Sequence, residues 1–243
     1  MPPLASQIFS TMTSNLFRIL LAISIGFCLP TVCHSQVRRA EVMATADAYL
    51  QLRWTPSAQN AFHGKDADGV QVDTPDISFS QPGTRPGWWL PKRINVGMPY
   101  KWGGFCTVDE FRAGVRNGCY AGDIYTPLKR RLGDTAVSKY AVGIDCSGLV
   151  SRCWKLERAY STHELASLCI PLASFDQLKA GDVLNSPHNH VLIFKAFTDA
   201  SRTRLLAYEA GSPPTWKVLL NDIPMSLLKG KHYVPLRYRK VRD

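Results

Sequence analysis

The residues of this sequence best suited to chemistry are a cysteine, a histidine and a glutamate: Cys146, His190 and Glu209. Cys146 lies in the stretch 143–150, which reads Gly-Ile-Asp-Cys-Ser-Gly-Leu-Val. A thiol becomes a good nucleophile when its thiolate is stabilised, and a helix N-terminus does this through free backbone N–H groups and the positive end of the helix dipole. The same N–H groups can hold an oxyanion. Cys146 is therefore a candidate nucleophile for acyl transfer.

A thiolate nucleophile needs a base and a group that orients the base. His190 opens an apolar run that predicts a strand, and Glu209 is the acid in the next run, 205–210. A carboxylate in an apolar strand needs a partner, and an imidazole on the adjacent strand provides one. His188 is the competing base, ranked lower because it lies in a Pro-Asn turn. Without such partners, Cys146 is better interpreted as a buried structural cysteine and Glu209 as a solvent-facing residue.

The elements around these residues predict an α+β fold. Apolar residues recur at helical spacing after Ser147 and Gly148, which indicates a helix that opens at about Cys146. Ser161 to Glu164 fits a capping box for a second short helix through Leu168. Strand-like runs follow, over 182–185, 190–197, 205–210, 216–220 and 233–238. We therefore expect helices packed on a curled antiparallel sheet of five to six strands.

The N-terminal third predicts a secretion signal and an extension. Arg18 precedes an apolar run over 19–29, and Cys33-His34-Ser35 offers small residues for cleavage, so 1–35 is interpreted as a secretion signal. Met12 is an alternative start, and an uncleaved membrane anchor is the alternative role. Residues 36–95 form an N-terminal extension, with a helix over 40–52 and a long irregular loop or small subdomain over 55–95. A catalytic domain then spans 96–243.

The bulk composition fits an exported globular protein. The 243 residues are 45% hydrophobic and 20% charged, and loss of Arg18 with the signal lowers the net charge from +10 to near +9. A basic exported protein suggests polyanionic surroundings such as a cell wall. The basic residues are scattered apart from 129–131 and 237–242, which are best interpreted as solvated basic faces, and no nucleic-acid motif accompanies them.

Several other kinds of site find no support in the sequence. There is no Cys-x-x-Cys or His-Glu-x-x-His spacing, which argues against a bound metal, and no Gly-rich phosphate loop or other sign of a cofactor. After removal of the signal, no stretch is long enough to span a membrane stably. Trp88-Trp89 would suit a carbohydrate platform, although packing is the better interpretation of such a pair.

The cysteines raise the question of pairing. Five remain after removal of the signal, at 106, 119, 146, 153 and 169, and an odd number in an oxidising compartment leaves at least one thiol free. Cys106 and Cys119 bracket one polar segment, and their disulfide is the favoured one. Cys153 pairs with Cys169 or both are buried thiols. Cys146 and Cys153 on one helix would be ~10.5 Å apart, too far to pair.

The motifs together resemble the NlpC-type cysteine peptidases, papain-like enzymes that cleave cell-wall peptides. The stretch 143–150, the run Leu178-Lys179-Ala180-Gly181-Asp182-Val183 and the strand from His190 occur in that family's order, and 98–104 is similar to its Pro-Tyr-x-Trp-Gly-Gly element. The resemblance implies a papain-like fold with Cys146 as nucleophile, His190 as base and Glu209 as third residue. It further implies that Tyr100, Trp102, Asp145 and Ser147 contact the substrate.

Two features depart from the family's pattern. About forty residues, 105–142, separate the tyrosine element from the nucleophile, and this insertion would roof or narrow the cleft. The third residue is a glutamate where the family more often has His, Asn or Gln. A carboxylate there raises the pKa of the imidazole by favouring its charged form.

The sequence thus predicts a secreted or periplasmic cysteine endopeptidase or amidase that acts on peptidoglycan stem peptides. Two alternatives remain open: an acyltransferase that uses the same thioester, and a catalytically inactive wall-binding module. The scissile bond and the oligomeric state are not readable from the sequence.

Overall fold

The computed structural model describes residues 36–80, 87–211 and 215–243. The predicted secretion signal, 1–35, therefore lies outside the described residues. The chain divides into two units at Cys33, and residues 34–243 form the unit considered below. The helix predicted over 40–52 is α1, Arg39–Leu50.

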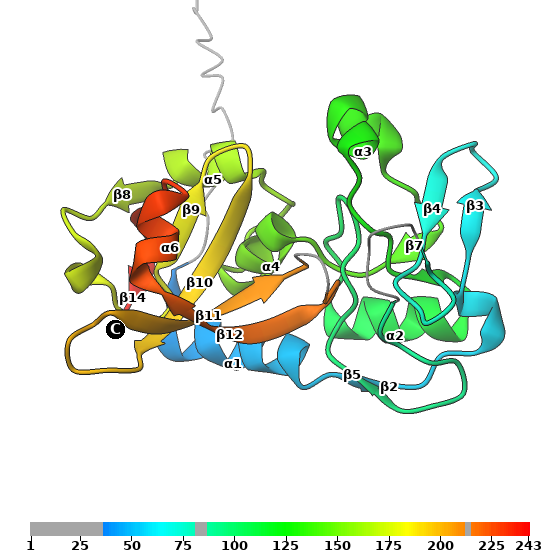
Figure 1. Cartoon of the computed structure of the whole chain (residues 1–243), viewed down its shortest axis with the longest axis horizontal. Helices are drawn as coiled ribbons and strands as arrows, with labels where there is room; N and C mark the ends of the chain where they lie inside the picture. The colour runs from blue at the N-terminus through cyan, green and yellow to red at the C-terminus, as the bar shows by residue number, and fades with distance from the viewer. Residues whose placement is uncertain (1–35, 81–86, 212–214) are drawn as a thin grey trace, which may run out of the picture. The chain divides into compact units, whose positions relative to one another are not determined.

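The main sheet has six strands in the order β12-β11-β10-β9-β13-β8, and every pairing in it is antiparallel. Its strands are β8 Cys169–Pro171, β9 Val183–Ser186, β10 His190–Phe197, β11 Arg204–Ala210, β12 Val218–Pro224 and β13 Val234–Tyr238. Figure 1 shows β10, β11 and β12 in yellow to orange. The prediction of an antiparallel sheet with five to six strands is confirmed, and the fold is mixed α and β.

The prediction of a helix that opens at about Cys146 is also confirmed. Helix α4 spans Cys146–Cys153, and α5 spans Thr162–Ser167 behind a capping box formed by Ser161 and Glu164. Three elements of this half escaped prediction: β8, the short helix α6, Met225–Gly230, and the second half of β12. The sequence of β12 places polar residues in mid-strand, which resemble a turn.

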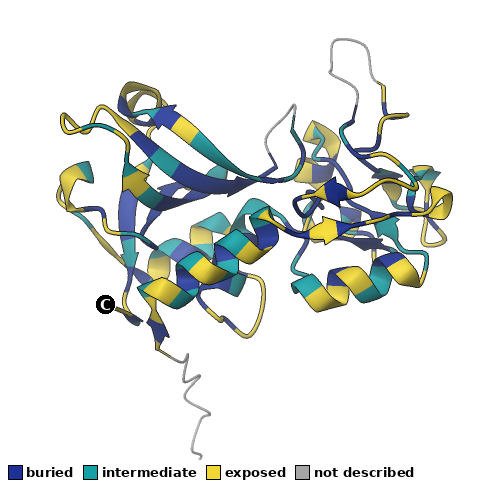
Figure 2. Cartoon of the chain, turned by 90° about the horizontal axis from the view of Figure 1, so that it is seen from below, coloured by how far each residue is buried: buried dark blue, intermediate teal, exposed yellow. Residues whose placement is uncertain are grey.

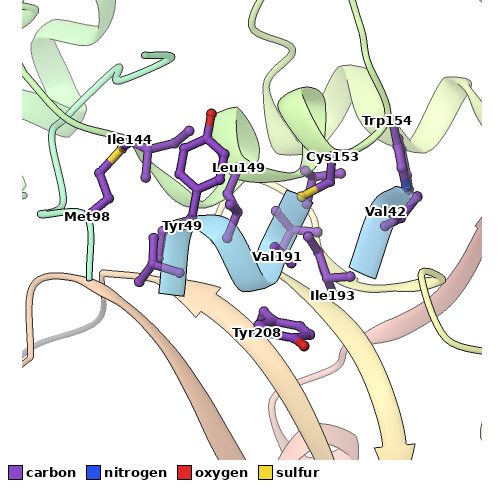
Figure 3. Packing of buried hydrophobic residues seen from close by; sticks show 14 of the residues in the cluster. Val42, Tyr49, Met98, Ile144, Leu149, Cys153, Trp154, Val191, Ile193 and Tyr208 are labelled. Carbon is purple, nitrogen blue, oxygen red and sulfur yellow. The ribbon is translucent and has the colours of Figure 1, made fainter. Parts of the chain in front are cut away.

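Two apolar clusters cover the two faces of the sheet. Val191, Ile193 and Tyr208 belong to the larger cluster, which includes residues of α1 and α4, whereas Leu192 and Leu205 belong to a second cluster with residues of α6. Figure 3 shows labelled side chains of α1 and α4 packed together with those of the strands. Figure 2 shows long buried stretches along the strands; β9 is buried throughout, whereas the edge strand β12 has several partly exposed residues. Because α4 packs on this rigid layer, its N-terminus is held at a fixed place beside the sheet.

The segment before α4 is irregular, as predicted for 55–95. It contains β2 Arg53–Trp54, η1 Ala58–Asn60, β3 His63–Lys65, β4 Gln71–Asp73, β5 Asn95–Val96, α2 Val108–Arg116, β6 Tyr120–Ala121, α3 Pro127–Leu132, η2 Gly133–Ala136 and β7 Ala141–Val142. The chain's first and last described strands, β1 Val37–Arg38 and β14 Val241–Arg242, pair in parallel. In the described part of 36–95 the strands have two or three residues, which is too short to show periodicity.

The disulfide favoured between Cys106 and Cys119 is not formed, and each of the five described cysteines is a free thiol. Helix α2 lies between these two residues in the sequence. Its nine residues rise about 13 Å, whereas bridged cysteines need Cα atoms within about 7 Å. Cys153 and Cys169 are buried thiols, and burial raises the pKa of each. Because all five described cysteines are unpaired, the odd number of cysteines does not single out Cys146 as the free thiol.

The basic clusters are less solvated than predicted. Lys129 is only 2% exposed and forms a buried ion pair with Asp123, while Arg237 is paired with buried Asp182 at 2.7 Å. Lys129 and Arg237 therefore stabilise the fold through these ion pairs and are not simply solvated surface charges.

The tryptophan pair is packing, as favoured from the sequence. Trp89 is fully buried, and its indole N–H donates to the Ala121 carbonyl at 3.1 Å. Trp88 donates to the Trp216 carbonyl at 3.1 Å.

Across 36–80, 87–211 and 215–243, no helix combines the length and apolarity needed to cross a membrane.

Candidate active site

Cys146 is the first residue of α4, and Asp145 is its N-cap. The Asp145 carboxylate accepts hydrogen bonds from the backbone N–H of Gly148 at 2.6 Å and from the Ser147 hydroxyl at 3.1 Å. An aspartate cap stabilises the first turn and fixes the direction in which the helix starts. The thiol of Cys146 is half-buried and so remains open to a ligand. The positive end of α4 consequently favours a thiolate at this position.

Gly148 permits a close backbone contact beside the nucleophile. A Cβ atom built on Gly148 would lie 2.1 Å from the carbonyl oxygen of Gly104, so only glycine fits. The Asp145 N–H also donates to that carbonyl at 3.1 Å. The first turn of α4 is thus clamped to the Pro-Tyr-x-Trp-Gly-Gly segment.

His190 and Glu209 form a buried hydrogen-bonded pair. His190 is the first residue of β10 and Glu209 the sixth of β11, and the imidazole Nε2 lies 3.0 Å from the carboxylate Oε2. Because a carboxylate only accepts, Nε2 carries the proton and Nδ1 is left for Cys146. Glu209 is 7% exposed, which excludes its interpretation as a solvent-facing residue.

The charge state of His190 is set by its two partners. Burial alone would lower the pKa of His190, but the charge and hydrogen bond of Cys146, followed by those of Glu209, raise this pKa to about 10. An imidazolium between a thiolate and a carboxylate is the arrangement that activates a cysteine nucleophile.

His188, the competing base, does not contact Glu209. It lies in the β9–β10 turn with a left-handed backbone (φ 60°), and its ring stacks on His163 of α5 with centroids 4.7 Å apart. The turn therefore points this imidazole at α5, and the preference for His190 over His188 is supported by the geometry.

Tyr100 belongs to the same site as Cys146, although forty-five residues separate the two in sequence. It forms a parallel bridge with Ile144, and the Lys101 N–H donates to the Ile144 carbonyl at 3.0 Å. A Cβ on Gly211 (φ 86°) would fall 1.7 Å from the Tyr100 ring, so the ring packs where only glycine leaves room. Burial, with the charges of Asp145 and Cys146, raises the pKa of Tyr100 well above its usual value, and its hydroxyl stays protonated.

The candidate site opens onto a cleft of about 970 Å³. Cys146, His190, Tyr100, Trp102, Asp145 and Ser147, all proposed from the sequence, line this cleft. Glu209 does not line it and lies behind the imidazole. The cleft is large enough for several residues of a peptide.

The insertion forms one wall of the cleft, as expected. Tyr125, Arg130, Asp134 and Val137 line it opposite residues of the α4–α5 loop. The Arg130 guanidinium donates to the His188 carbonyl at 2.6 Å and so joins this wall to the β9–β10 turn. Trp102 also binds to this wall, because its indole N–H donates to the Gly133 carbonyl at 3.2 Å.

The buried side chain of Lys129 anchors this wall of the cleft. Its ammonium group is buried against Asp123 and donates to the Gln71 carbonyl at 2.7 Å. Helix α3 is therefore anchored by Lys129, while the next residue, Arg130, faces the cleft.

Sequence reasoning missed two residues of the site. Asn221 of β12 donates a hydrogen bond to the second oxygen of Glu209, Oε1. Arg130 was noted only as part of a basic run. The polar position of Asn221 inside an otherwise apolar stretch was a usable signal, but it resembled a turn.

No protein-family model, no curated protein and no solved structure matches this chain. Within the described ranges there is also no group of three or more His, Cys, Asp or Glu side chains placed to hold a metal ion.

Proposed function

We propose that the chain is an exported cysteine hydrolase of the NlpC type, with a papain-like fold, that cleaves an amide bond in peptidoglycan stem peptides. The observation that carries the proposal is the pair of His190 Nε2 and Glu209 Oε2, 3.0 Å apart, behind a cysteine at a helix N-terminus. The resemblance of 98–104, 143–150, 178–183 and 190–194 to the NlpC pattern supports the substrate class.

In the first step the thiolate of Cys146 attacks the carbonyl carbon of the amide. A C–S bond forms and the carbonyl oxygen becomes an oxyanion. The backbone N–H of Cys146, in the first turn of α4, and the Tyr100 hydroxyl supply donors for this oxyanion. The imidazolium of His190 then gives its proton to the leaving nitrogen as the C–N bond breaks, leaving a thioester.

In the second step His190 acts as base. The neutral imidazole takes a proton from water, the hydroxide adds to the thioester carbonyl, and the C–S bond breaks. The product is a carboxylic acid, and the thiolate–imidazolium pair is restored. Glu209 holds the imidazole through both steps, since its bond to Nε2 leaves Nδ1 aligned with the sulfur.

Charge also favours this substrate class. A formal net charge near +9 after loss of the signal, with Arg18, would attract the protein to anionic wall polymers. The cleft is lined by Arg130 and Arg158 as well as Asp134 and Glu164, so it offers partners to both carboxylates and amines of a peptide.

The test is digestion of purified peptidoglycan, with mass spectrometry of the soluble fragments. Wild-type protein should release fragments whose masses correspond to hydrolysis of one amide bond, and Cys146→Ala should release none. Cys119→Ala, which removes another described free thiol that does not line the cleft, is a matched control that should retain release. Undiminished release by Cys146→Ala would sink the proposal, and products carrying an added amine would identify an acyltransferase instead.

A further inference from the structure

Glu209 accepts hydrogen bonds on both of its carboxylate oxygens. Oε2 faces His190 at 3.0 Å, and Oε1 accepts from the side-chain amide of Asn221. Because Glu209 can only accept, the amide of Asn221 must present its NH₂ group. Asn221 is half-buried on β12, which is the edge strand of the sheet.

The strand register places Glu209 and Asn221 on one face of the sheet. Glu209 pairs with Leu219, and Asn221 lies two residues further along β12 on the same face. The two side chains are diagonal neighbours, at the spacing where cross-strand side chains still reach one another. The pairing of β10 with β11 runs from Ile193 opposite Tyr208 to Phe197 opposite Leu205, so His190 is joined to Glu209 by its side-chain hydrogen bond and not by strand register.

A glutamate at this position needs such a second contact. Its side chain has three rotatable bonds, and one hydrogen bond to the imidazole leaves the carboxylate free to rotate. A donor on the far oxygen holds the carboxylate plane and keeps Oε2 directed at Nε2. Asn and His, which the resembled family more often has at this position, have fewer rotatable side-chain bonds and so lack this rotational freedom.

We propose that Asn221 is a positioning residue for the thiolate–imidazolium pair, which it supports by holding Glu209 against His190. The inference rests on the proposed thiolate nucleophile but is independent of the substrate. The other titratable groups that influence this pair are Cys146 of α4 and Tyr233, just before β13, whose pKa is raised by burial and by the charges of Glu209 and Cys146.

The experiment is the pH dependence of alkylation of Cys146 by iodoacetamide, read by mass spectrometry of the peptide that contains it. In wild-type full-length protein the rate should rise at a pH well below that of an ordinary thiol. Asn221→Leu, which keeps the volume and removes the donor, should move this rise upward by at least half a pH unit. Asn221→Ala, which also removes the donor, gives the same readout from a smaller side chain if Asn221→Leu unfolds.

A double-mutant cycle separates positioning from general structural damage. In a Glu209→Gln background, adding Asn221→Leu should shift the pH at which alkylation of Cys146 rises. This shift should be less than a third of the shift that Asn221→Leu causes in wild type, because Asn221 acts through Glu209. Asp222→Asn, on the same strand and paired with Arg204 at 3.0 Å, is the matched control and should not shift it.

The outcomes are distinct. An unshifted rise in both Asn221 variants, or an equal shift in both backgrounds, overturns the role of Asn221. A wild-type Cys146 that alkylates only at the pH of an ordinary thiol contradicts the proposed function itself.

Discussion

At the scale of single residues, the site depends on one proton held between two anionic partners. The imidazole of His190 is buried beside Cys146 and Glu209, and these partners outweigh the cost of burial, so the pKa of His190 rises to about 10. The active form of a cysteine hydrolase requires this proton. Activity should therefore persist at alkaline pH and fall only as pH rises through the pKa of His190.

Glu209→Gln tests this argument. Loss of the carboxylate charge lowers the pKa of His190, so the alkaline limb of kcat/KM should move down from about pH 10 by roughly one unit or more. The measurement is the rate of fragment release between pH 5 and 11. Asp222→Asn, which removes an acid from the neighbouring strand, should leave the limb in place. An alkaline limb unchanged in Glu209→Gln would show that the carboxylate does not tune the imidazole.

At the scale of elements, helix α3 contributes Arg130 to one side of the cleft. It is anchored through the buried ion pair of Lys129 with Asp123, and Arg130 extends from it to the His188 carbonyl at 2.6 Å. This contact joins the insertion to the turn that leads into His190. It therefore closes one side of the cleft without touching the reacting atoms.

Arg130→Ala should open that side of the cleft. A typical intramolecular hydrogen bond contributes roughly 1 kcal/mol. If it holds this side of the cleft closed, its loss should raise the ratio of kcat/KM for cross-linked over uncross-linked stem peptides by up to about fivefold. Kinetics on the two fragment classes measure this ratio. Alkylation of Cys146 by iodoacetamide should not change, and Arg131→Ala, the exposed neighbour, should keep the wild-type ratio. A ratio that stays the same in Arg130→Ala contradicts a gating role for this contact.

The elements also show what was predictable. Periodicity and capping identified α4 and α5 within a residue because their signals are local: Asp145 caps the first, and Ser161 with Glu164 boxes the second. The bond between His190 and Glu209 followed from two adjacent strands. The role of Asn221 was not predictable, because a polar residue in mid-strand acquires its meaning only from the register of β11 with β12.

At the scale of the whole molecule, long-range contacts assemble the site. Tyr100 and Ile144 are brought together by backbone pairing, which closes the insertion at its base. Sequence alone could place this segment in the site only through a family resemblance, since no local pattern records such a pairing. The disulfide favoured from the sequence was wrong, since the positions of two cysteines in the chain do not record whether their side chains meet, and both are free thiols.

Five described free thiols now compete for any reagent, and this competition offers the most direct test. Cys153 and Cys169 are buried and burial raises the pKa of each thiol, as it does for Cys106. Among these five described thiols, Cys146 alone combines a helix N-terminus with a neighbouring imidazolium.

The decisive measurement is iodoacetamide labelling of the folded protein at pH near 6, with each cysteine assigned by peptide mass spectrometry. The thiolate–imidazolium pair predicts that Cys146 is labelled at least tenfold faster than Cys119, and that His190→Ala abolishes the difference. Equal labelling of Cys146 and Cys119 at that pH, or a rate unaffected by His190→Ala, would contradict the assignment of Cys146 as the nucleophile.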